Sequence, residues 1–309
     1  MAYLRAFGAY LPKRVVTNIE MAALAGCEAD WIFDVSGIEE RRFAEAGETV
    51  ADMGAHAAED CLRRAGLGAS ALGAVMVASG SSERRFPGPA CLVAHKLGLD
   101  NVPAWDVPMA SAGSLFALAM ASDLAPSMGH VLVVGAEKMS AVVLGEPVDK
   151  NVAVLFGDGA GACLVSPGDG PGRIAASVLG SDGAFAESLH LEFSQTLAMD
   201  GRTVILQASR KVPRAISQVL EKGARQAADV DVFLMHQANR NLMVRVARAL
   251  GVAEEKFYTN IRRYGNTSSA SLLIAACEWW SENGFRPGSS VVLAAFGAGF
   301  HWGAVLVEG

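Results

Sequence analysis

The chain has 309 residues, of which 51% are hydrophobic and 19% are charged. This composition excludes an intrinsically disordered chain and requires a large buried core. The formal net charge of −6 at pH 7 argues against nucleic acid as the main partner, because phosphate binding needs a basic field.

The N-terminus and the cysteines favour a cytoplasmic location. Residues 1–7 contain Arg5 and no continuous apolar segment, which argues against a secretory signal. The five cysteines are scattered without a C-x-x-C pair, so neither a disulfide framework nor a zinc site is predicted. The longest uncharged stretch, 107–122, is too short to span a membrane, so no membrane partner is expected.

Strand and helix patterns follow one another along the chain. Short apolar runs predict strands covered on both faces, and longer segments between them predict helices. The predicted strands are 72–78, 131–134, 230–235 and 291–294, and the predicted helices are 53–65, 112–124 and 241–250. We therefore expect mixed sheets with helices packed on them.

Two segments of the chain repeat one motif. Residues 156–165 and 296–307 both read F-G-x-G followed by G-A-x-L-V. Each segment follows an apolar run, and each run follows a helix rich in small residues that begins near Ser111 or Ser268. Three matching elements in the same order predict a duplicated α/β unit.

The repeat divides the chain into two halves. We expect an N-terminal half at residues 1–167 and a C-terminal half at residues 168–309. The spacing between matching elements differs between the halves, which places extra chain in the first half between residues 137 and 153.

Ser111 lies at a predicted strand-to-helix turn. A nucleophile at such a turn is exposed, and the free N–H groups of the first helical turn can stabilise an oxyanion. The hydrolase motif G-x-S-x-G would need glycine at position 109, where this chain has Met109. The alternative role for Ser111 is a simple helix N-cap.

His236 and Asn266 are further polar candidates at the ends of elements. His236 follows the buried run 230–235, where α/β folds place their sites, and it can act as a general base or donate to a carbonyl oxygen. Asn266 precedes the second small-residue helix and can donate to a developing enolate oxygen. Their alternative roles are a buried structural histidine and a turn residue. No histidine has metal-ligand spacing, so no metal is predicted.

The glycine-rich segments 157–159 and 297–299 are not phosphate loops. Neither continues as G-x-G-x-x-G before a helix, and neither is a Walker A sequence. We expect both to form tight hairpins that bring the backbone close to a ligand.

Taken together, these segments resemble the β-ketoacyl-ACP synthase III family of thiolase-fold condensing enzymes, nearly from end to end. The resemblance implies an α/β protein with the five-layer αβαβα thiolase fold, two pseudo-repeated halves and a homodimer. The segments that carry it are 31–38 with 41–42, 86–87, 156–161, H-Q-A-N at 236–239, G-N-T-S at 265–268, and 296–300 with 302–303.

The resemblance also implies the chemistry. A Cys-His-Asn site takes an acyl group from coenzyme A and condenses it with malonyl-ACP, releasing CO₂ and priming fatty-acid or polyketide synthesis. Coenzyme A is then a thioester substrate, and no cofactor stays permanently bound. His236 and Asn266 match the residues that bind the malonyl thioester carbonyl, while the N–H groups of Gly299 and residue 111 match the oxyanion hole.

Other matched residues have implied binding roles. Phe86 matches the residue that reaches across the dimer into the partner's acyl pocket. Trp31 matches an aromatic residue that stacks on the adenine of coenzyme A, and Lys150 stands where the family often has an arginine near the phosphates of coenzyme A. Val35 stands where the family often has an arginine, which weakens the expected clamp on the adenine.

Arg214 and Arg248 match basic positions that bind the acidic carrier protein. Their alternative role is to form part of a solvated helix face.

Ser111 is the main departure from the family. The family pattern A-C-A-G reads Ala110-Ser-Ala-Gly113 in this chain, so a hydroxyl replaces the nucleophilic thiol. A thiol is readily converted to a thiolate, whereas a serine hydroxyl needs a base at the moment of attack. An oxygen ester is also a poorer acyl donor to carbon than a thioester is. We therefore expect slow acylation and slower condensation.

Three interpretations of Ser111 stay open. It is an engineered replacement of the cysteine in an ordinary condensing enzyme, or a natural serine variant used in specialised acyl transfer. The third interpretation is a non-catalytic subunit that binds carrier protein or a partner ketosynthase, although His236 and Asn266 argue against it. A hydrolase of another fold would need an acid to orient His236, and the spacing identifies none.

Overall fold

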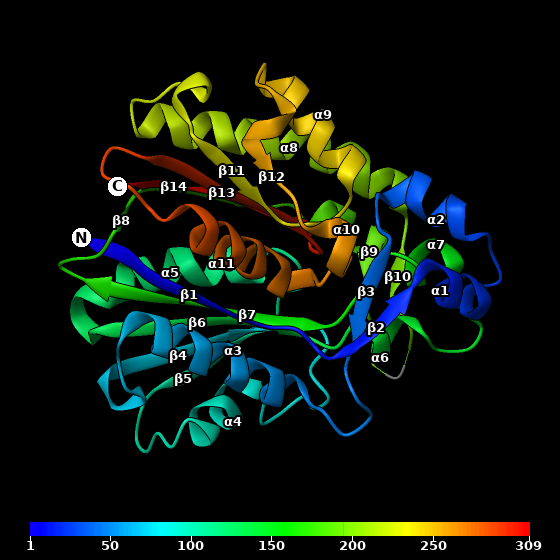
Figure 1. The fold of residues 1–309 in the computed structure, drawn as a ribbon, viewed down its shortest axis with the longest axis horizontal. Helices are drawn as coiled ribbons and strands as arrows, with labels where there is room; N and C mark the ends of the chain where they lie inside the picture. Colours follow the sequence, from blue (N-terminus) through cyan, green and yellow to red (C-terminus); the bar gives the residue numbers. More distant parts are fainter. Residues whose placement is uncertain (194) are drawn as a thin grey trace.

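The computed structural model describes residues 1–193 and 195–309, and ten strands form its main sheet (Figure 1). The strand order is β12-β11-β13-β14-β8-β1-β7-β6-β4-β5. The strands are β1 (Ala2–Tyr10), β4 (Leu72–Ala78), β5 (Ala104–Val107), β6 (His130–Glu137), β7 (Gly159–Pro167), β8 (Gly172–Ser181), β11 (Val232–Met235), β12 (Phe257–Tyr258), β13 (Ser290–Gly297) and β14 (His301–Glu308).

These strands form two sets of five that are arranged alike. The orders β1-β7-β6-β4-β5 and β8-β14-β13-β11-β12 correspond strand by strand. In the first set β4 is parallel to β5 and β6, and β7 is antiparallel to β6 and β1. In the second set β11 is parallel to β12 and β13, and β14 is antiparallel to β13 and β8. The two pseudo-repeated halves are confirmed, and β7 ends at residue 167, after which the sequence predicted the division.

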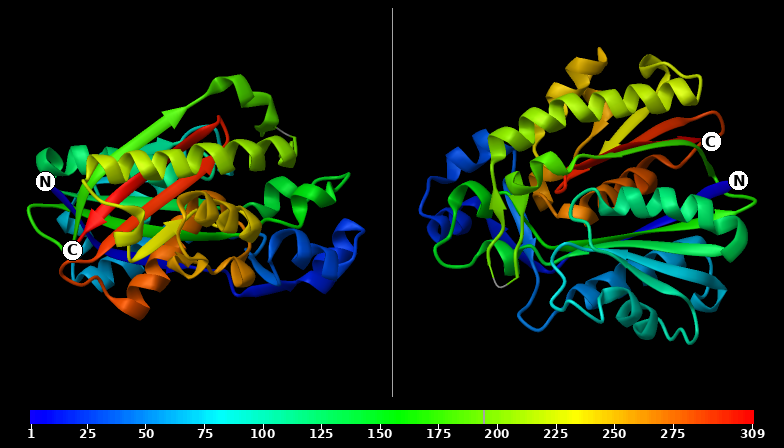
Figure 2. Two further views of the ribbon diagram at one scale, coloured as in Figure 1. Left: turned by 90° about the horizontal axis from the view of Figure 1, so that it is seen from above. Right: turned by 180° about the vertical axis from the view of Figure 1, so that it is seen from behind.

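Helices form three layers around the two sets of strands. Figures 1 and 2 show α5 (Gly113–Met128) and α11 (Ser271–Asn283) between the sets, where α5 contacts β6 and β14 and α11 contacts β7 and β11. The outer face of the first set is covered by α3 (Val50–Ala65) and α4 (Pro89–Lys96), and that of the second by α8 (Gly201–Lys222) with α9 (Arg240–Leu250) beside it. This is the predicted five-layer αβαβα arrangement.

The two central helices are made of small and apolar residues because both of their faces are buried. Residues 271–277 of α11 are all buried, and so are most residues of the first three turns of α5. A helix that is apolar all round is buried all round, and small side chains let both sheets approach it closely. The N-termini of these two helices meet in the interior, where Ser111 contacts Ser268.

A group of short elements lies beside the layers. It contains β2 (Arg14–Thr17), α1 (Asn18–Ala25), α2 (Ala29–Ser36), β3 (Glu40–Phe43), α6 (Ser140–Val143), α7 (Lys150–Ala153), β9 (Leu189–His190), β10 (Ala198–Met199) and α10 (Ile261–Tyr264). Because α6 and α7 connect β6 to β7 while β13 continues directly into β14, the extra chain predicted in the first half is confirmed.

The two glycine-rich segments differ in structure. The predicted hairpin is correct for 297–299, which joins β13 to β14, and wrong for 157–159, which lies between α7 and β7. There the N–H of Gly157 donates to the carbonyl oxygen of Asn266 at 3.1 Å. A Cβ at position 157 would lie 2.5 Å from the carbonyl oxygen of Tyr264, so the glycine permits close backbone packing rather than a hairpin.

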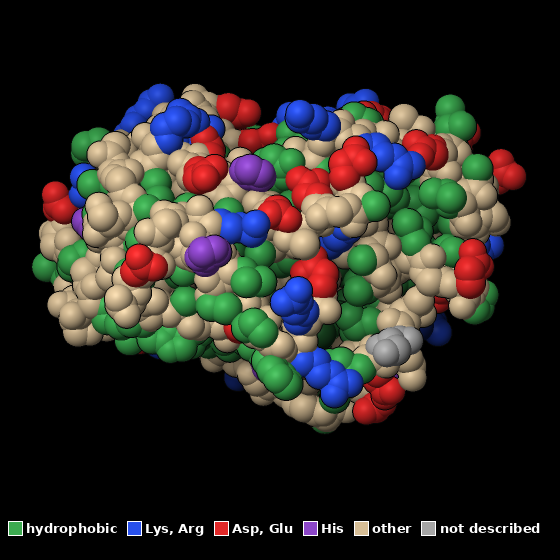
Figure 3. All heavy atoms as spheres, turned by 90° about the horizontal axis from the view of Figure 1, so that it is seen from below, with side chains coloured by type: hydrophobic (Ala, Val, Ile, Leu, Met, Phe, Trp, Pro, Cys, Tyr) green, Lys and Arg blue, Asp and Glu red, His purple; other side chains and the backbone are tan. Residues whose placement is uncertain are grey.

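Surface charges of both signs are interspersed. On the face drawn in Figure 3, Lys and Arg side chains alternate with Asp and Glu. No helix in residues 1–193 or 195–309 is long and apolar enough to cross a membrane.

Candidate active site

Ser111 lies in the turn between β5 and α5. It is 8% exposed, and its backbone has φ of +60°, a left-handed conformation that is uncommon for a residue with a side chain. The turn places Ser111 just before the first turn of α5, whose N–H groups have no partner within the helix. The predicted strand-to-helix turn is therefore present.

The hairpin between β13 and β14 closes over this turn. A Cβ at Gly297 would lie 2.4 Å from the carbonyl oxygen of Ala110 and 2.9 Å from Cβ of Ser111. Only glycine lets the hairpin backbone come this close to the serine. The repeated F-G-x-G motif of the second half thus serves a packing need at Ser111.

His236 follows β11 and is 2% exposed. Its Nδ1 lies 2.5 Å from Oγ of Ser271, the first residue of α11. Burial lowers the pKa of His236 to about 4, and a hydrogen bond with the backbone of Ser268 opposes this shift. The imidazole is consequently neutral at pH 7 and can exchange hydrogen bonds with a ligand without carrying a charge.

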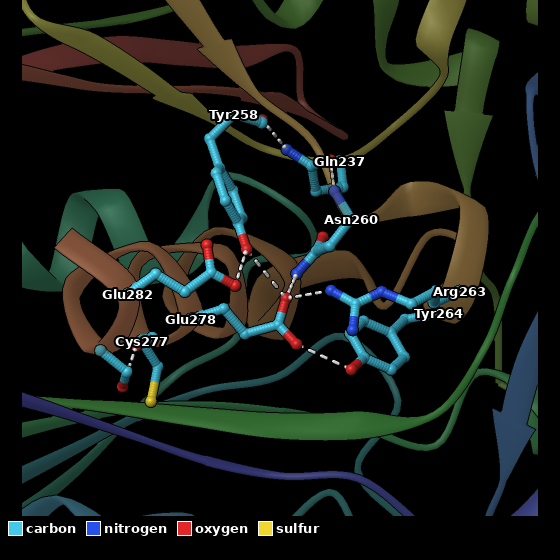
Figure 4. A network of polar contacts seen from close by, with 9 residues as sticks. Gln237, Tyr258, Asn260, Arg263, Tyr264, Cys277, Glu278 and Glu282 are labelled. Carbon is cyan, nitrogen blue, oxygen red and sulfur yellow. Dashed lines mark hydrogen bonds and ion pairs between the residues drawn. The ribbon is translucent and has the colours of Figure 1, made fainter.

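A buried polar network holds the chain behind His236. The side chain of Gln237 donates to the carbonyl oxygen of Tyr258 and accepts from the N–H of Asn260. Asn260 in turn donates to Glu278 of α11 at 2.8 Å, and Tyr264 donates to the same carboxylate at 2.7 Å (Figure 4). These bonds fix the end of β11 against α11 and so hold the position of the imidazole.

Asn266 precedes α11 in the chain and is 6% exposed. Its Oδ1 accepts from the N–H of Ser268 at 2.9 Å, and its backbone bridges to Phe156. Because the side-chain oxygen is engaged, the amide nitrogen is the group of Asn266 left to donate to a ligand.

One cavity of about 320 Å³ brings these three side chains together. Ser111, His236 and Asn266 all line it, although they come from three separate parts of the chain. The rest of its wall is largely apolar and includes Met139, Val154, Leu155, Phe156, Leu189, Leu197, Met199, Val204, Ile205, Leu242 and Phe296. An apolar cavity with a few convergent polar groups is typical of a small-molecule site.

Ser268 is a cavity residue that the sequence analysis did not select as a site residue. Its Oγ accepts from the backbone N–H of Ser111 at 2.9 Å and lies 3.4 Å from Oγ of Ser111. The only signal in the sequence is its place in the repeat, since Ser268 begins the second small-residue segment as Ser111 begins the first.

Glu137 was also missed. This fully buried carboxylate at the end of β6 accepts from the hydroxyl groups of Ser79 and Ser81 and from the N–H groups of Gly80 and Ser269. None of the ion pairs found in the described residues includes it. It links a loop of the first half to the Asn266–Ser269 loop of the second.

The loop that contains Gly299 presents a different residue to the cavity. Among the described residues, Gly297 and Ala298 line the cavity and Gly299 does not. A Cβ at Gly299 would meet the ring of His301 at 2.3 Å, so this glycine packs against β14. The oxyanion role predicted for Gly299 stays a prediction, and Ala298 is the neighbouring residue that lines the cavity.

The two residues predicted to bind coenzyme A, Trp31 and Lys150, lie together. Lys150 Nζ is 5.7 Å from the ring centroid of Trp31, within the range of a cation–π contact. Trp31 lines the cavity together with Val35 and Asn151, so the pair lies at the cavity wall. The uncharged Val35 supplies no second cation there.

Three further predicted binding residues, like Lys150, do not line the cavity. Phe86 is 85% exposed. Arg214 on α8 and Arg248 on α9 are exposed on two helices that contact each other. Among the ion pairs of the described residues, none involves either arginine.

Comparisons with known proteins agree with this architecture. Residues 105–183 match the family model for 3-oxoacyl-[acyl-carrier-protein] synthase III, and residues 220–308 match the model for its C-terminal part. The chain is 38% identical to the β-ketoacyl-[acyl-carrier-protein] synthase III of Oleidesulfovibrio alaskensis, over 99% of this chain and 98% of that protein. It is 37% identical to the same enzyme of Aquifex aeolicus, over 97% of each chain.

Solved structures give the same result. The synthase III of Aquifex aeolicus superposes with a TM-score of 0.95 at 35% identity, covering 100% of both chains. The priming β-ketosynthase of the R1128 polyketide pathway superposes with a TM-score of 0.92 at 33% identity, covering 100% of this chain and 96% of that one. The thiolase fold predicted from the sequence is confirmed, and the chain belongs to the β-ketoacyl-[acyl-carrier-protein] synthase III family of condensing enzymes.

Proposed function

We propose that this protein transfers an acyl group from coenzyme A to Oγ of Ser111 and then condenses it with malonyl-ACP. The observation that carries the proposal is that Ser111, His236 and Asn266 line one largely apolar cavity. The reaction would yield 3-oxoacyl-ACP, CO₂ and free coenzyme A, and would prime a fatty-acid or polyketide chain.

The first step is acylation. The bond between Ser111 Oγ and the acyl carbon forms, the carbon–sulfur bond of the thioester breaks, and the hydroxyl proton ends on the departing thiol. Backbone N–H groups at residue 111 and in the 297–299 loop would stabilise the oxyanion. The low pKa of His236 makes its imidazole a weak base, which supports slow acylation of a hydroxyl.

The second step is decarboxylative condensation. The malonyl carboxylate leaves as CO₂, and the resulting enolate carbon attacks the acyl carbonyl. The new carbon–carbon bond replaces the ester bond to Ser111, whose oxygen regains a proton. A neutral His236 and the amide of Asn266 would donate to the thioester carbonyl as charge develops on its oxygen.

The substrates would reach the site from the side of Trp31. The Trp31–Lys150 pair supports binding of an adenine and its phosphates. Arg214 and Arg248 support docking of an acidic carrier protein, and exposed Phe86 supports a homodimer in which it enters the partner's acyl pocket. The five free cysteines support a reducing compartment, in line with a cytoplasmic enzyme.

Intact-protein mass spectrometry tests the proposal. After incubation with acetyl-CoA and longer acyl-CoAs, we expect a lasting mass increase that maps to residue 111 and is absent in Ser111→Ala. Supplying malonyl-ACP should then remove the acyl group and release 3-oxoacyl-ACP.

The outcomes separate the remaining interpretations of Ser111. An acyl-enzyme that passes its acyl group to other acceptors but not to malonyl-ACP would indicate a serine-dependent acyltransferase. An unacylated protein whose Ser111→Cys variant is fully active would indicate a condensing enzyme disabled by replacement of its cysteine. Inactivity of both forms, with carrier protein still bound, would indicate a non-catalytic subunit and contradict the proposal.

A further inference from the structure

We propose that Ser268 is a further residue of the acyl-transfer site, whose hydroxyl occupies the oxyanion position of the empty enzyme and is displaced by the carbonyl oxygen of the acyl donor. This inference rests on the proposed acylation of residue 111. It assigns to the Ser268 hydroxyl a slowing of acylation, whereas Ser111, His236 and Asn266 take part in the two reaction steps themselves.

The first observation is the partner of the residue 111 amide. Ser268 Oγ accepts this N–H at 2.9 Å. An oxyanion stabilised by a backbone N–H lies about 2.7–3.1 Å from the nitrogen. The hydroxyl oxygen therefore stands at the distance that the developing oxyanion requires, and one N–H cannot serve both oxygens fully.

The second observation is the rigidity of the backbone at Ser268. Its N–H donates to Asn266 Oδ1, while the N–H of Ser269 donates to Glu137 and the hydroxyl of Ser269 donates to the carbonyl oxygen of Ala78 at 2.9 Å. With the backbone held on both sides, only the hydroxyl can leave, by rotation about the Cα–Cβ bond.

The third observation is the strain shared by the two serines. Ser111 has φ of +60° and Ser268 has φ of +46°, so both are in the left-handed region. Both are buried, and a buried N–H without an acceptor is costly. The Ser268 hydroxyl supplies this acceptor when no acyl group is present.

The need to displace this hydroxyl slows acylation. The hydrogen bond from the N–H of Ser111 to Ser268 Oγ must break before the incoming carbonyl oxygen can accept from that N–H. Removing the hydroxyl should then raise the apparent second-order rate constant for acylation by roughly three- to tenfold, the factor that one net hydrogen bond is worth. The amide of residue 111 should at the same time lose protection against hydrogen exchange.

The experiment compares Ser268→Ala with the parent chain, both in the present protein and in its Ser111→Cys variant, using acetyl-CoA as the acyl donor. Acylation is followed by rapid-quench intact-mass measurement, and hydrogen–deuterium exchange is followed in peptides covering residues 108–116. Ser268→Gly is a second variant, because glycine adopts the positive φ of position 268 without steric cost. Ser269→Ala is the matched control, because it removes a buried hydroxyl from the same loop that bonds Ala78 instead of residue 111.

We expect faster acylation and faster exchange in both Ser268 variants and neither change in Ser269→Ala. Slower or unchanged acylation in Ser268→Ala and Ser268→Gly would overturn the inference; a slower rate would make the hydroxyl a donor to the oxyanion. Absence of acylation in Ser111→Cys with Ser268 intact would instead defeat the proposed function, and the inference would fail with it.

Discussion

The two halves of the molecule present equivalent turns to the same cavity but equip them differently. Ser111 before α5 and Ser268 at the start of the segment leading into α11 occupy matching places in the repeat, and both have positive φ. The second half adds His236 and Asn266 to its turn, whereas the first half adds Asn151 and the Trp31–Lys150 pair to the cavity wall and its surroundings.

This difference indicates how a duplicated fold can divide a two-step reaction. The first half contributes Ser111 as the acyl acceptor and the Trp31–Lys150 pair. The second half contributes the imidazole of His236 and the amide of Asn266. Under the proposed function, substitutions in the first half should change acylation, and substitutions at His236 or Asn266 should change decarboxylation.

His236→Ala should have the largest effect. We expect malonyl-ACP decarboxylation to fall by about 100-fold or more, because a positioned acid–base or donor group contributes about 10²–10⁴-fold. Release of labelled CO₂ measures this step. In the Ser111→Cys background, acylation by acetyl-CoA should stay within roughly threefold of the parent, since no hydrogen bond joins His236 to Ser111 among the described residues.

The exposed His95 on α4 provides the control for this substitution. His95→Ala should alter neither step. Decarboxylation that survives in His236→Ala would remove His236 from the mechanism, and an equal loss of acylation would end the proposed division between the halves.

The stability of the fold should depend on pH through the same residue. The pKa of His236 is lowered to about 4 from an unfolded value of 6.5, so the unfolded chain binds a proton that the folded chain excludes. Well above pH 6.5 His236 is neutral in both the folded and the unfolded chain. As the pH decreases from 6.5 to 4 only the unfolded chain gains the proton, so the free energy of unfolding should fall by roughly 3 kcal/mol.

Denaturant unfolding at a series of pH values checks this expectation. His236→Asn should lose this part of the pH dependence, and His95→Asn should keep it. If the free energy of unfolding of the two variants changes equally with pH between 6.5 and 4, burial of a neutral His236 is not the cause of the pH dependence.

Ser111→Cys should have the next largest effect, on acylation and on condensation from the acylated enzyme. We expect condensation to rise at least about tenfold, because a thiolate is a stronger nucleophile and a thioester is a better acyl donor. Decarboxylation measured without an acyl donor should stay unchanged. Ser114→Cys, at a buried hydroxyl in the first turn of α5, is the matched control and should give no gain. An unchanged condensation rate in Ser111→Cys would argue against residue 111 as the acyl acceptor.

The sequence predicted those features of the fold and site that rest on local patterns. Ser111, His236 and Asn266 each stand at the end of an element, and the repeat of F-G-x-G implied that the two halves share one plan. The cavity brings the three residues together as expected. The strand 72–78 was also predicted with the bounds that β4 has.

Residues whose roles depend on contacts between the halves were not predictable in this way. Glu137 looks like an ordinary acidic residue after a strand, and its burial becomes apparent only when Ser269 of the other half lies against it. The contact between Ser268 and Ser111 likewise spans 157 positions of sequence. The hairpin prediction failed at 157–159 because the glycine there serves packing against Tyr264, which a local pattern does not reveal.

Substitution of Trp31 should have the smallest effect, and it tests most directly whether the first half binds coenzyme A. Trp31→Ala removes the aromatic ring beside Lys150, and we expect KM for acetyl-CoA to rise about three- to tenfold with little change in kcat, because an aromatic stacking or cation–π contact contributes about 0.5–1.5 kcal/mol. KM for an acyl-pantetheine, which lacks the adenine, should stay unchanged. Phe33→Ala, at a partly exposed aromatic residue of the same helix that does not line the cavity, is the control and should leave both values as they are. Equal losses with acetyl-CoA and acyl-pantetheine would show that Trp31 shapes the cavity wall instead of binding the adenine.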